Sequence, residues 1–237
     1  LERINYEAEH NASAFIARTE AAFHRDIRKI AETIASSTDL CKVIMLAGPS
    51  SSGKTTTAHI LLDALRECGI GSQVISLDNF YKGESDAPLL ENGQHDYESV
   101  EALNVPLLER CLLDLMETNT CEMPVFDFEN HCPHPYTRRI RFGEREIAVV
   151  EGIHALNPAI SRHLPEDGVL KIYISVKQGF EEQGEALLSP NQVRLVRRLV
   201  RDSLFRNTQP GRTLDMWDTV MDGERKYIKP YRGEADV

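Results

Sequence analysis

The pattern of apolar and polar positions predicts strands that alternate with helices along most of the chain. Short apolar runs typical of buried strands occur at residues 43–47, 73–77, 147–150 and 169–174. Helical periodicity covers residues 57–65 and stops near Gly69, and a second helix is predicted to start at Asn104, two residues before Pro106. Strands that alternate with helices favour an α/β fold with a mainly parallel sheet flanked by helices.

An amphipathic helix is predicted upstream of the first strand, over residues 11–37. Its apolar positions recur at helical spacing and are Phe15, Phe23, Ile27, Ile30 and Ile34. The segment carries no pattern with evident chemistry, so we interpret it as a packing or connecting element.

Residues 122–146 depart from this alternation. Two short strand-like pieces, at 125–128 and 138–142, flank a turn rich in histidine and proline. This pattern predicts a hairpin or an extended excursion from the sheet, and such excursions often build substrate pockets.

Composition and charge exclude several classes of function. The formal charge of −10 would repel a nucleic-acid backbone over most of the surface, and no apolar run approaches the ~20 residues of a membrane helix. The five cysteines are odd in number and include no C-x-x-C pair, which favours reduced thiols. We therefore expect a cytoplasmic protein that binds no nucleic acid and no membrane, with a monomer and a homo-oligomer both left open.

A phosphate-binding loop is the sharpest motif in the sequence. The pattern G-x-x-x-x-G-K-[ST] is matched by Gly48-Pro49-Ser50-Ser51-Ser52-Gly53-Lys54-Thr55, and Thr56 follows it. The glycines let backbone N–H groups face phosphates, Lys54 supplies a positive charge, and the Thr55 hydroxyl is suited to Mg²⁺. Because the motif lies between a predicted strand and a predicted helix, it favours ATP and Mg²⁺ binding over a structural glycine turn.

Two acidic residues lie just past the carboxyl ends of predicted strands, where open α/β sheets bind ligands. Asp78 follows residues 73–77, and Glu151 follows residues 147–150. One carboxylate beside an acceptor hydroxyl can take its proton, and another can hold Mg²⁺. We predict the first role for Asp78 and the second for Glu151; the alternatives are a cap or turn residue and a simple strand-end acid.

A basic stripe is predicted on a helix that starts near Asn191. Its arginines fall within one narrow arc and are Arg194, Arg197, Arg198 and Arg201, with Arg206 and Arg212 beyond. Apolar residues occupy the rest of this surface, at Leu195, Val196, Leu199 and Val200. We interpret the stripe as a lid that closes on a triphosphate, and a solvated face paired with surface acids is the alternative.

Several segments, in this order and spacing, resemble the phosphoribulokinase/uridine kinase family over about residues 42–237. They are Gly48 to Thr56, Asp78-Asn79-Phe80-Tyr81, Phe126-Asp127-Phe128 with His131, Glu151-Gly152-Ile153-His154, Arg194 to Asp202, and Glu234-Ala235-Asp236. The chain resembles in particular bacterial uridine kinase-like proteins with an N-terminal domain similar to part of threonyl-tRNA synthetase. The resemblance implies an N-terminal helical connector over residues 1–40 and a P-loop kinase domain over residues 41–237. We expect the chain to begin inside a longer gene product and to end at the start of a last strand.

The resemblance also implies roles for individual residues. Asp78 matches the family's general base for a 5′-hydroxyl, and with Lys54 and Arg198 it makes up the predicted catalytic set. The lid arginines Arg194 and Arg201 would join residues 48–56 in binding ATP. The acceptor site would be lined by Tyr81, Asp96, Phe126 and His131.

Departures from the family pattern concern the acceptor. Phe126 stands where nucleoside kinases usually have a tyrosine, Cys132-Pro133 replace a small residue and an arginine after His131, and residues 94–97 differ from the usual Phe-Asp-His-Pro. A site that reads a base by hydrogen bonds needs such polar groups. We predict a uridine/cytidine kinase-like enzyme, with a kinase for a sugar, polyol or other non-nucleoside acceptor as the alternative.

Functions of other classes have less support in the sequence. A GTPase-like switch would need an N-K-x-D guanine-reading motif, which the sequence lacks, and a regulatory ATP-binding module would be favoured only without Asp78 and Glu151. His131, Cys132 and His134 lack a fourth zinc ligand at a recognisable spacing, so we interpret them as pocket or turn residues.

Overall fold

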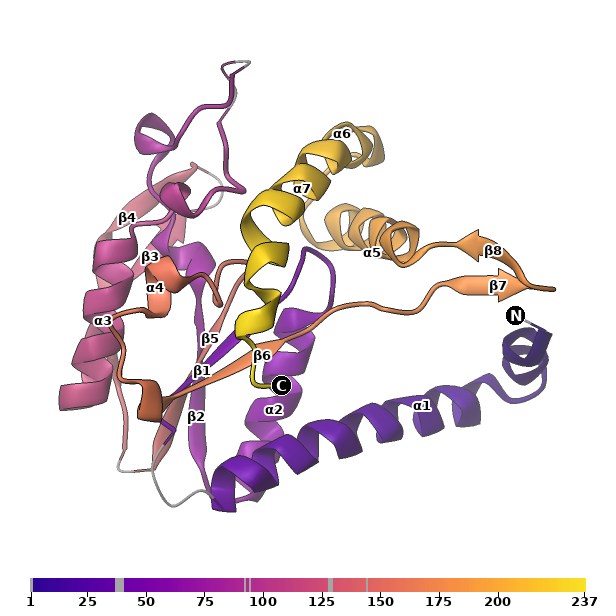
Figure 1. The fold of residues 1–237 in the computed structure, drawn as a ribbon, viewed down its shortest axis with the longest axis horizontal. Helices are drawn as coiled ribbons and strands as arrows, with labels where there is room; N and C mark the ends of the chain where they lie inside the picture. Colours follow the sequence, from indigo (N-terminus) through magenta and orange to yellow (C-terminus); the bar gives the residue numbers. More distant parts are fainter. Residues whose placement is uncertain (1, 37–40, 92, 94, 128–129, 144) are drawn as a thin grey trace.

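The centre of the molecule is a four-stranded sheet in the order β2-β5-β1-β6, in which all neighbouring strands are parallel (Figure 1). The computed structural model describes residues 2–36, 41–91, 93, 95–127, 130–143 and 145–237. The strands are β1 (Val43–Ala47), β2 (Gly71–Ser76), β5 (Glu146–Glu151) and β6 (Val169–Tyr173). The predicted α/β fold with a parallel sheet is confirmed.

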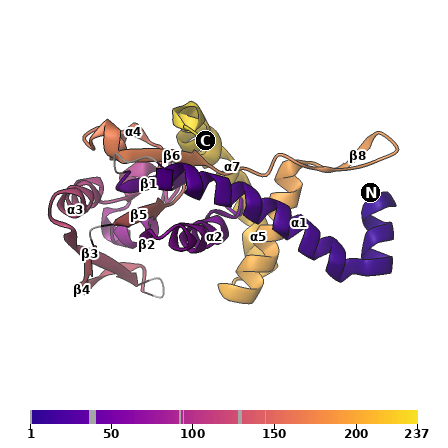
Figure 2. The same cartoon turned by 90° about the horizontal axis from the view of Figure 1, so that it is seen from below.

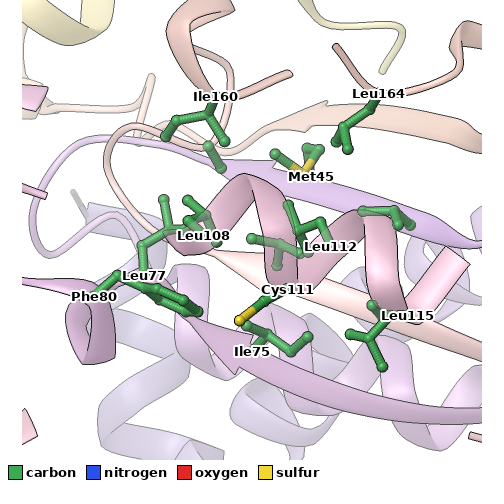
Figure 3. Close-up of a cluster of buried hydrophobic side chains, with 14 of the residues drawn as sticks. Met45, Ile75, Leu77, Phe80, Leu108, Cys111, Leu112, Leu115, Ile160 and Leu164 are labelled. Atoms are coloured by element: carbon green, nitrogen blue, oxygen red, sulfur yellow. The ribbon is translucent and has the colours of Figure 1, made fainter. Parts of the chain in front are cut away.

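Both faces of this sheet are covered. Every residue of β1 is buried, and its alternate side chains enter two separate hydrophobic clusters. Met45 joins the cluster beneath α3 (Val105–Thr118), where it lies near Leu108 (Figure 3). Ile44 joins the cluster beneath α2 (Lys54–Glu67) on the other face. The short helix α4 (Pro158–Ser161) adds Ile160 to the α3 side.

The ends of the two sheet-covering helices follow the signals in the sequence. α3 begins at Asn104, whose side chain accepts a hydrogen bond from the Leu107 N–H at 3.3 Å. α2 ends before Gly69, which takes a left-handed conformation with φ of 77°. Both boundaries confirm the predictions.

The N-terminal helix is longer than the apolar pattern predicts. α1 spans Glu2–Ser36, and its backbone leaves helical angles at Asn11, where it turns sharply (Figure 2). Ile34 is buried against the α2 side of the sheet, as the pattern predicts, whereas Phe23 stays exposed. The prediction of a helix over residues 11–37 agrees with the structure at its start, because the backbone is non-helical at Asn11 and the Asn11 side chain accepts a hydrogen bond from the Ala14 N–H at 3.2 Å. The helical turns before Asn11 were not predicted, and residue 37 lies outside the described part.

The predicted excursion is an antiparallel hairpin of β3 (Thr120–Asp127) and β4 (Cys132–Arg141). Its strands are longer than the predicted pieces because the pairing continues from Thr120 opposite Arg141 to Asp127 opposite Cys132. Phe128, the last residue of the predicted piece 125–128, lies outside the described residues.

The predicted basic helix is confirmed as α5 (Pro190–Phe205). A capping box starts it: the Gln192 N–H donates to the Ser189 hydroxyl, and the Ser189 N–H donates to the Gln192 side chain. The other elements of this region are β7 (Phe180–Glu182), β8 (Glu185–Leu188), α6 (Pro210–Asp215), α7 (Trp217–Gly223), a π-helical turn (Glu224–Ile228) and a 3₁₀ turn (Lys229–Glu234). Further 3₁₀ turns lie at Leu77–Phe80, Glu84–Asp86, Val100–Ala102 and Glu166–Gly168.

The last residues return to the free edge of β6. The Val237 N–H donates to the Lys171 carbonyl at 3.3 Å, and the Val237 carbonyl accepts from the Tyr173 N–H at 3.0 Å. This is the hydrogen-bond pattern of residues paired in parallel.

Two properties expected from composition can be compared with the structure. Within the described residues, none of the helices has the length and apolar character needed to span a membrane. The five cysteines are free thiols in the structure.

Leu112→Ala should destabilise the fold strongly. Leu112 is fully buried between α3 and the sheet, so its truncation should leave a cavity and lower the free energy of unfolding by about 2–5 kcal/mol. Leu204→Ala is the matched control, because Leu204 on α5 is 69% exposed and should change stability by less than about 0.5 kcal/mol. Urea unfolding followed by circular dichroism measures both variants, and equal effects would contradict the assigned core.

Candidate active site

The predicted phosphate loop connects β1 to α2, as its motif requires. Ser51 and Gly53 take left-handed conformations, with φ of 59° and 102°. A Cβ at Gly48 would collide with the Ile174 carbonyl and would lie 2.9 Å from the Ser52 hydroxyl, so the first glycine is needed for close packing. No side chain in the described structure caps α2, which leaves the first N–H groups of that helix available to an anion.

Lys54 lies among the charged groups of the site. Its Nζ donates to the Pro49 carbonyl at 3.1 Å. Burial lowers the pKa of Lys54 to about 8, while the carboxylates of Glu151 and Asp78 act to raise it. Both acids therefore act electrostatically on the same ammonium group.

The predicted metal-binding pair, Thr55 and Glu151, is brought together. Glu151 is the last residue of β5 and is buried, and its Oε1 accepts a hydrogen bond from the Ser76 hydroxyl at 2.9 Å. Burial raises the pKa of Glu151, whereas Lys54 and the hydroxyls of Ser76 and Thr55 lower it. The Thr55 hydroxyl at the start of α2 is therefore one of the hydrogen-bonding groups that act on the Glu151 carboxylate.

Asp78 occupies the adjacent strand end. It lies in the 3₁₀ turn that follows β2, where its N–H donates to the Ser76 hydroxyl at 3.4 Å. Ser76 and Glu151 are opposite each other in the β2–β5 ladder, so the two acids follow neighbouring parallel strands. The negative charge of Asp78 also raises the pKa of Tyr81, after the larger effect of burial.

The predicted acceptor residues Tyr81, Phe126 and Asp96 come from three segments. The rings of Tyr81 and Phe126 meet edge to face at 6.1 Å, and the Tyr81 hydroxyl donates to the Tyr97 carbonyl at 3.1 Å. Asp96 is buried and accepts a hydrogen bond from the Tyr227 hydroxyl at 2.8 Å. These contacts place Tyr81 and Phe126 together and connect Asp96 to the turn after α7.

His131 differs from the other predicted acceptor residues. It lies at the tip of the β3–β4 hairpin with φ of 52° and an exposed side chain. The structure therefore places it at the hairpin turn, whereas Phe126 and Asp96 are buried.

The predicted lid arginines of α5 contact the phosphate loop directly. Arg194 Nε donates to the Ser50 carbonyl at 3.1 Å, and Arg198 Nη1 donates to the Ser50 hydroxyl at 2.9 Å. Arg197 Nε donates to the Ser51 carbonyl at 3.1 Å. The alternative of a solvated basic face is wrong for the inner arginines, because Arg194 is only 2% exposed and Arg198 is also buried.

Part of the apolar surface of α5 faces outward, whereas Leu195 and Leu199 are half-buried. Its exposed residues are Val196, Val200, Leu204 and Phe205, with Phe205 80% exposed. A cavity of about 410 Å³ lies between this side and the phosphate loop, and its lining includes Lys54, Thr55, Thr56, Arg197 and Arg201. Arg201 is held by two hydrogen bonds to Asp202, at 2.9 and 2.7 Å, and burial lowers its pKa.

A second cavity, of about 400 Å³, lies at the β6 side of the loop. It is lined by Pro49, Tyr173, Ser175, Val176, Lys177, Asn191, Arg194, Glu224, Lys229 and Arg232. Asp78 and Glu151 follow β2 and β5, on the other side of β1 in the sheet order. The two cavities and the pair Asp78 and Glu151 therefore lie on different sides of the phosphate loop.

Sequence reasoning missed two functional candidates, Glu98 and His154. Burial raises the pKa of Glu98 to about 7, although Arg198 and Lys54 act to lower it. His154 is 1% exposed, and neither ring nitrogen has a hydrogen-bond partner in the part of the chain that the structure describes. Burial lowers the pKa of His154 to about 4, so its imidazole is neutral at physiological pH. His154 belongs to a matched motif, but only tertiary structure reveals its burial, and Glu98 carries no sequence signal.

Comparison with known proteins decides the family. The family model described as phosphoribulokinase/uridine kinase matches residues 43–237. The chain belongs to this family. A uridine kinase from Ligilactobacillus salivarius is 26% identical to it over 196 residues, which cover 82% of this chain and 83% of that protein. The predicted class of enzyme is thus confirmed: the protein is a phosphotransferase that acts on a hydroxyl group, and ATP use is implied by the kinase family.

Solved structures share the fold of this kinase. A Bacillus stearothermophilus protein described as a possible uridine kinase has a TM-score of 0.57 at 20% identity and covers 90% of this chain and 97% of its own. A D-glycerate 3-kinase from Cryptococcus neoformans has a TM-score of 0.54 at 16% identity and covers 88% and 87%. At these identities the likeness shows the fold alone.

Glu98→Gln should make the kinase more stable than wild type at high pH. A raised carboxyl pKa means that Glu98 stabilises the fold fully below its unfolded pKa of about 4.3, and that this stability is lost as pH rises through about 7. The difference between Glu98→Gln and wild type should grow by on the order of 3–4 kcal/mol across this range.

Urea unfolding at pH 4, 6 and 8 measures this difference. The control is Glu101→Gln, which makes the same change of side chain at an exposed position. A pH-independent difference for Glu98→Gln would show that its carboxyl is not held in the protonated form.

Proposed function

We propose that the kinase transfers the γ-phosphate of ATP to a hydroxyl of a uridine- or cytidine-like nucleoside, the acceptor class named for its relatives. The observation that carries this proposal is the meeting of Lys54, Glu151 and Asp78 beneath the arginines of α5. Glu151 and Asp78 act to raise the pKa of Lys54, and Lys54 acts to lower the pKa of Glu151. Lys54 follows β1, Glu151 ends β5 and Asp78 follows β2, and these three strands are neighbours in one parallel sheet. Such an arrangement combines phosphate binding, proton removal and charge neutralisation at one place.

The phosphate loop would hold the triphosphate. Its glycine-shaped backbone and the open start of α2 offer N–H donors, and Lys54 can move from the Pro49 carbonyl to the phosphates. The cavity lined by Thr56, Arg197 and Arg201 lies at the same place and carries the positive charge that a phosphate tail requires. In an in-line transfer, the acceptor hydroxyl and the departing ADP lie on opposite sides of the transferred phosphoryl group. The nucleoside half of ATP would therefore lie on the side away from Asp78, where the basic cavity beside β6 can receive it.

The residues present fit Mg²⁺. Thr55 and Glu151 offer a hydroxyl and a carboxylate oxygen side by side, and hard oxygen ligands of this kind suit Mg²⁺ together with phosphate oxygens. When bound, Mg²⁺ would neutralise charge that develops on the transferred phosphoryl group. Thr55 and Glu151 would hold the ion, and the Ser76 hydroxyl would orient the carboxylate of Glu151.

Asp78 is the proposed general base. It lies at the end of β2, beside the acceptor residue Tyr81 and within the electrostatic reach of Lys54. As the O–P bond forms, Asp78 would accept the proton of the acceptor hydroxyl, while Arg198 and Lys54 would neutralise the phosphoryl oxygens. The buried carboxylate of Asp96 is suited to bind further hydroxyl groups of the acceptor, and Tyr81 and Phe126 would form its apolar wall.

A sugar or polyol acceptor is the second candidate. Phe126 is buried and carries no hydroxyl, so it cannot read a base by a hydrogen bond. Asp96, Glu98 and His154 instead add polar groups near the same space, since Asp96 influences the pKa of both Glu98 and His154. A wall of this chemistry would also suit an acceptor that is dense in hydroxyl groups.

Two further proposals concern the setting of the kinase fold. The free thiols support a reducing compartment, which we take to be the cytoplasm. α1 supports the role of residues 1–40 as a connector to an N-terminal domain similar to part of threonyl-tRNA synthetase, with residues 37–40 outside the described part. Its first half extends beyond the sheet and exposes Ile4, Tyr6 and Ile16, which a neighbouring domain could cover (Figure 2).

An acceptor panel tests the substrate class. Purified protein with ATP and Mg²⁺ should release ADP in the presence of uridine or cytidine, and the assay should include other nucleosides, ribulose 5-phosphate, pantothenate and simple polyols. Turnover with only a sugar or polyol would replace the nucleoside proposal with the second candidate. ATP binding without acceptor-dependent ADP release would contradict the kinase proposal and favour a regulatory module.

Asp78→Asn should lower kcat by a factor on the order of 10² or more while ATP binding stays near that of wild type. The substitution removes the proton acceptor and keeps the size of the side chain. Asp63→Asn is the matched control, because Asp63 lies on exposed α2 surface and pairs with Arg66. Wild-type turnover in Asp78→Asn would remove Asp78 from the mechanism.

A further inference from the structure

The π-helical turn Glu224–Ile228 contacts both halves of the active site. It follows α7 directly, and π-helical turns are rare features that occur frequently at functional sites. Glu224 points to the lid and Tyr227 points to the acceptor loop, and only three positions separate them in the sequence. Neither residue carries a role in the proposed mechanism.

Glu224 fixes the lid arginine that lies deepest in the site. Its carboxylate lies 2.6 Å from Arg194 Nη1, and the two side chains are only 3% and 2% exposed. Arg194 in turn donates from Nε to the Ser50 carbonyl of the phosphate loop, and its guanidinium lies over the Trp217 ring at 5.6 Å. Because a buried guanidinium without its acid is costly, Arg194 can keep this position only while Glu224 stays in place.

Tyr227 fixes the buried carboxylate of the acceptor loop. Its hydroxyl donates to Asp96 Oδ2 at 2.8 Å, and Asp96 Oδ1 accepts from the Glu98 N–H at 3.2 Å. The Tyr227 ring also packs edge to face on His154 at 6.4 Å. Both oxygens of Asp96 are thus oriented, and one of them depends on the turn.

We propose that Glu224 and Tyr227 are positioning residues that couple closure of the lid on ATP to the arrangement of the acceptor site. The path runs from Ser50 through Arg194 and Glu224, along one turn of backbone, to Tyr227 and Asp96. A lid movement that separates Arg194 from Ser50 displaces Glu224, and the same rigid turn then withdraws the Tyr227 hydroxyl from Asp96. The inference rests on the proposed function, since it assumes that ATP and the acceptor occupy these two places.

Coupling of this kind has a reciprocal signature. If ATP orders the acceptor site through the turn, the acceptor must tighten ATP binding by the same factor. A residue with a merely structural role would lower stability without changing this factor.

Tyr227→Phe should raise the KM for the acceptor by on the order of tenfold, because one hydrogen bond to a charged group is lost. The dissociation constant of ATP measured without acceptor should change little. The acceptor is uridine, or the compound with the highest turnover in the panel. Arg225→Gln is the control on the same turn: Arg225 pairs with the exposed Asp222 and should leave both constants unchanged. In an Asp96→Asn background the effect of Tyr227→Phe should nearly disappear, and full additivity of the two substitutions would overturn the positioning role of Tyr227.

Hydrogen exchange tests the coupling without turnover. Addition of the non-hydrolysable analogue AMP-PNP should slow amide exchange over residues 95–103 in wild type and in Arg225→Gln, and this protection should be lost in Glu224→Gln and Tyr227→Phe. Glu224→Asp keeps the charge and should restore part of it, and thermal unfolding identifies any variant that fails to fold. Protection that persists in folded Glu224→Gln and Tyr227→Phe would overturn the coupling.

The two proposals fail in distinguishable ways. Protection by AMP-PNP without turnover of any acceptor would remove the proposed acceptor and support the coupling. Turnover in wild type without such protection would support the kinase function and overturn the coupling.

Discussion

The closed site depends on one arrangement, the packing of the α5 arginines against the oxygens of the phosphate loop. A guanidinium group is costly to bury unless an acid pairs with it. Arg194 Nη1 lies 2.6 Å from Glu224 Oε2, and Arg198 Nε lies 3.3 Å from Asp202 Oδ2. One of these acids lies on α5 itself and the other on the turn that follows α7, so the lid, the turn and the loop are stable in this form only as a unit.

This arrangement explains the reversed orientation of α5. In a helix on a globular domain the apolar face normally packs inward, but here the inner face carries arginines because the phosphate loop offers carbonyl and hydroxyl oxygens. The apolar residues are consequently turned toward solvent and the cavity beside Lys54. The exposure of Val196 and Val200 thus follows from the position of the arginines, which the phosphate loop requires on the inner face of the helix.

The parts of the fold that could be predicted are those that local sequence determines. The segment from β1 through the phosphate loop to α2 is continuous in the chain, and its glycines and its lysine follow from the shape of the loop. The outer end of α1 was not predicted, because it precedes the non-helical backbone at Asn11 and lies outside the apolar pattern of the predicted helix. Glu98 and His154 were missed for another reason: their perturbed pKa values arise from burial by segments far away in the sequence. The contact between Tyr227 and Asp96 likewise joins residues 131 positions apart.

The same distinction explains why the phosphate side of the site is easier to recognise than the acceptor side. Phosphate binding uses backbone N–H groups, a tight turn and one lysine, and these requirements leave a continuous motif. The proposed acceptor side consists of single side chains on separate elements: Tyr81 after β2, Phe126 on the hairpin, Asp96 on a loop and Tyr227 on the π-helical turn. Each of these can be exchanged without disturbing the others' backbone, so a different acceptor requires few substitutions and leaves the phosphate machinery intact. A relative with 26% identity therefore supports the chemistry of phosphate transfer more firmly than it supports the choice of acceptor.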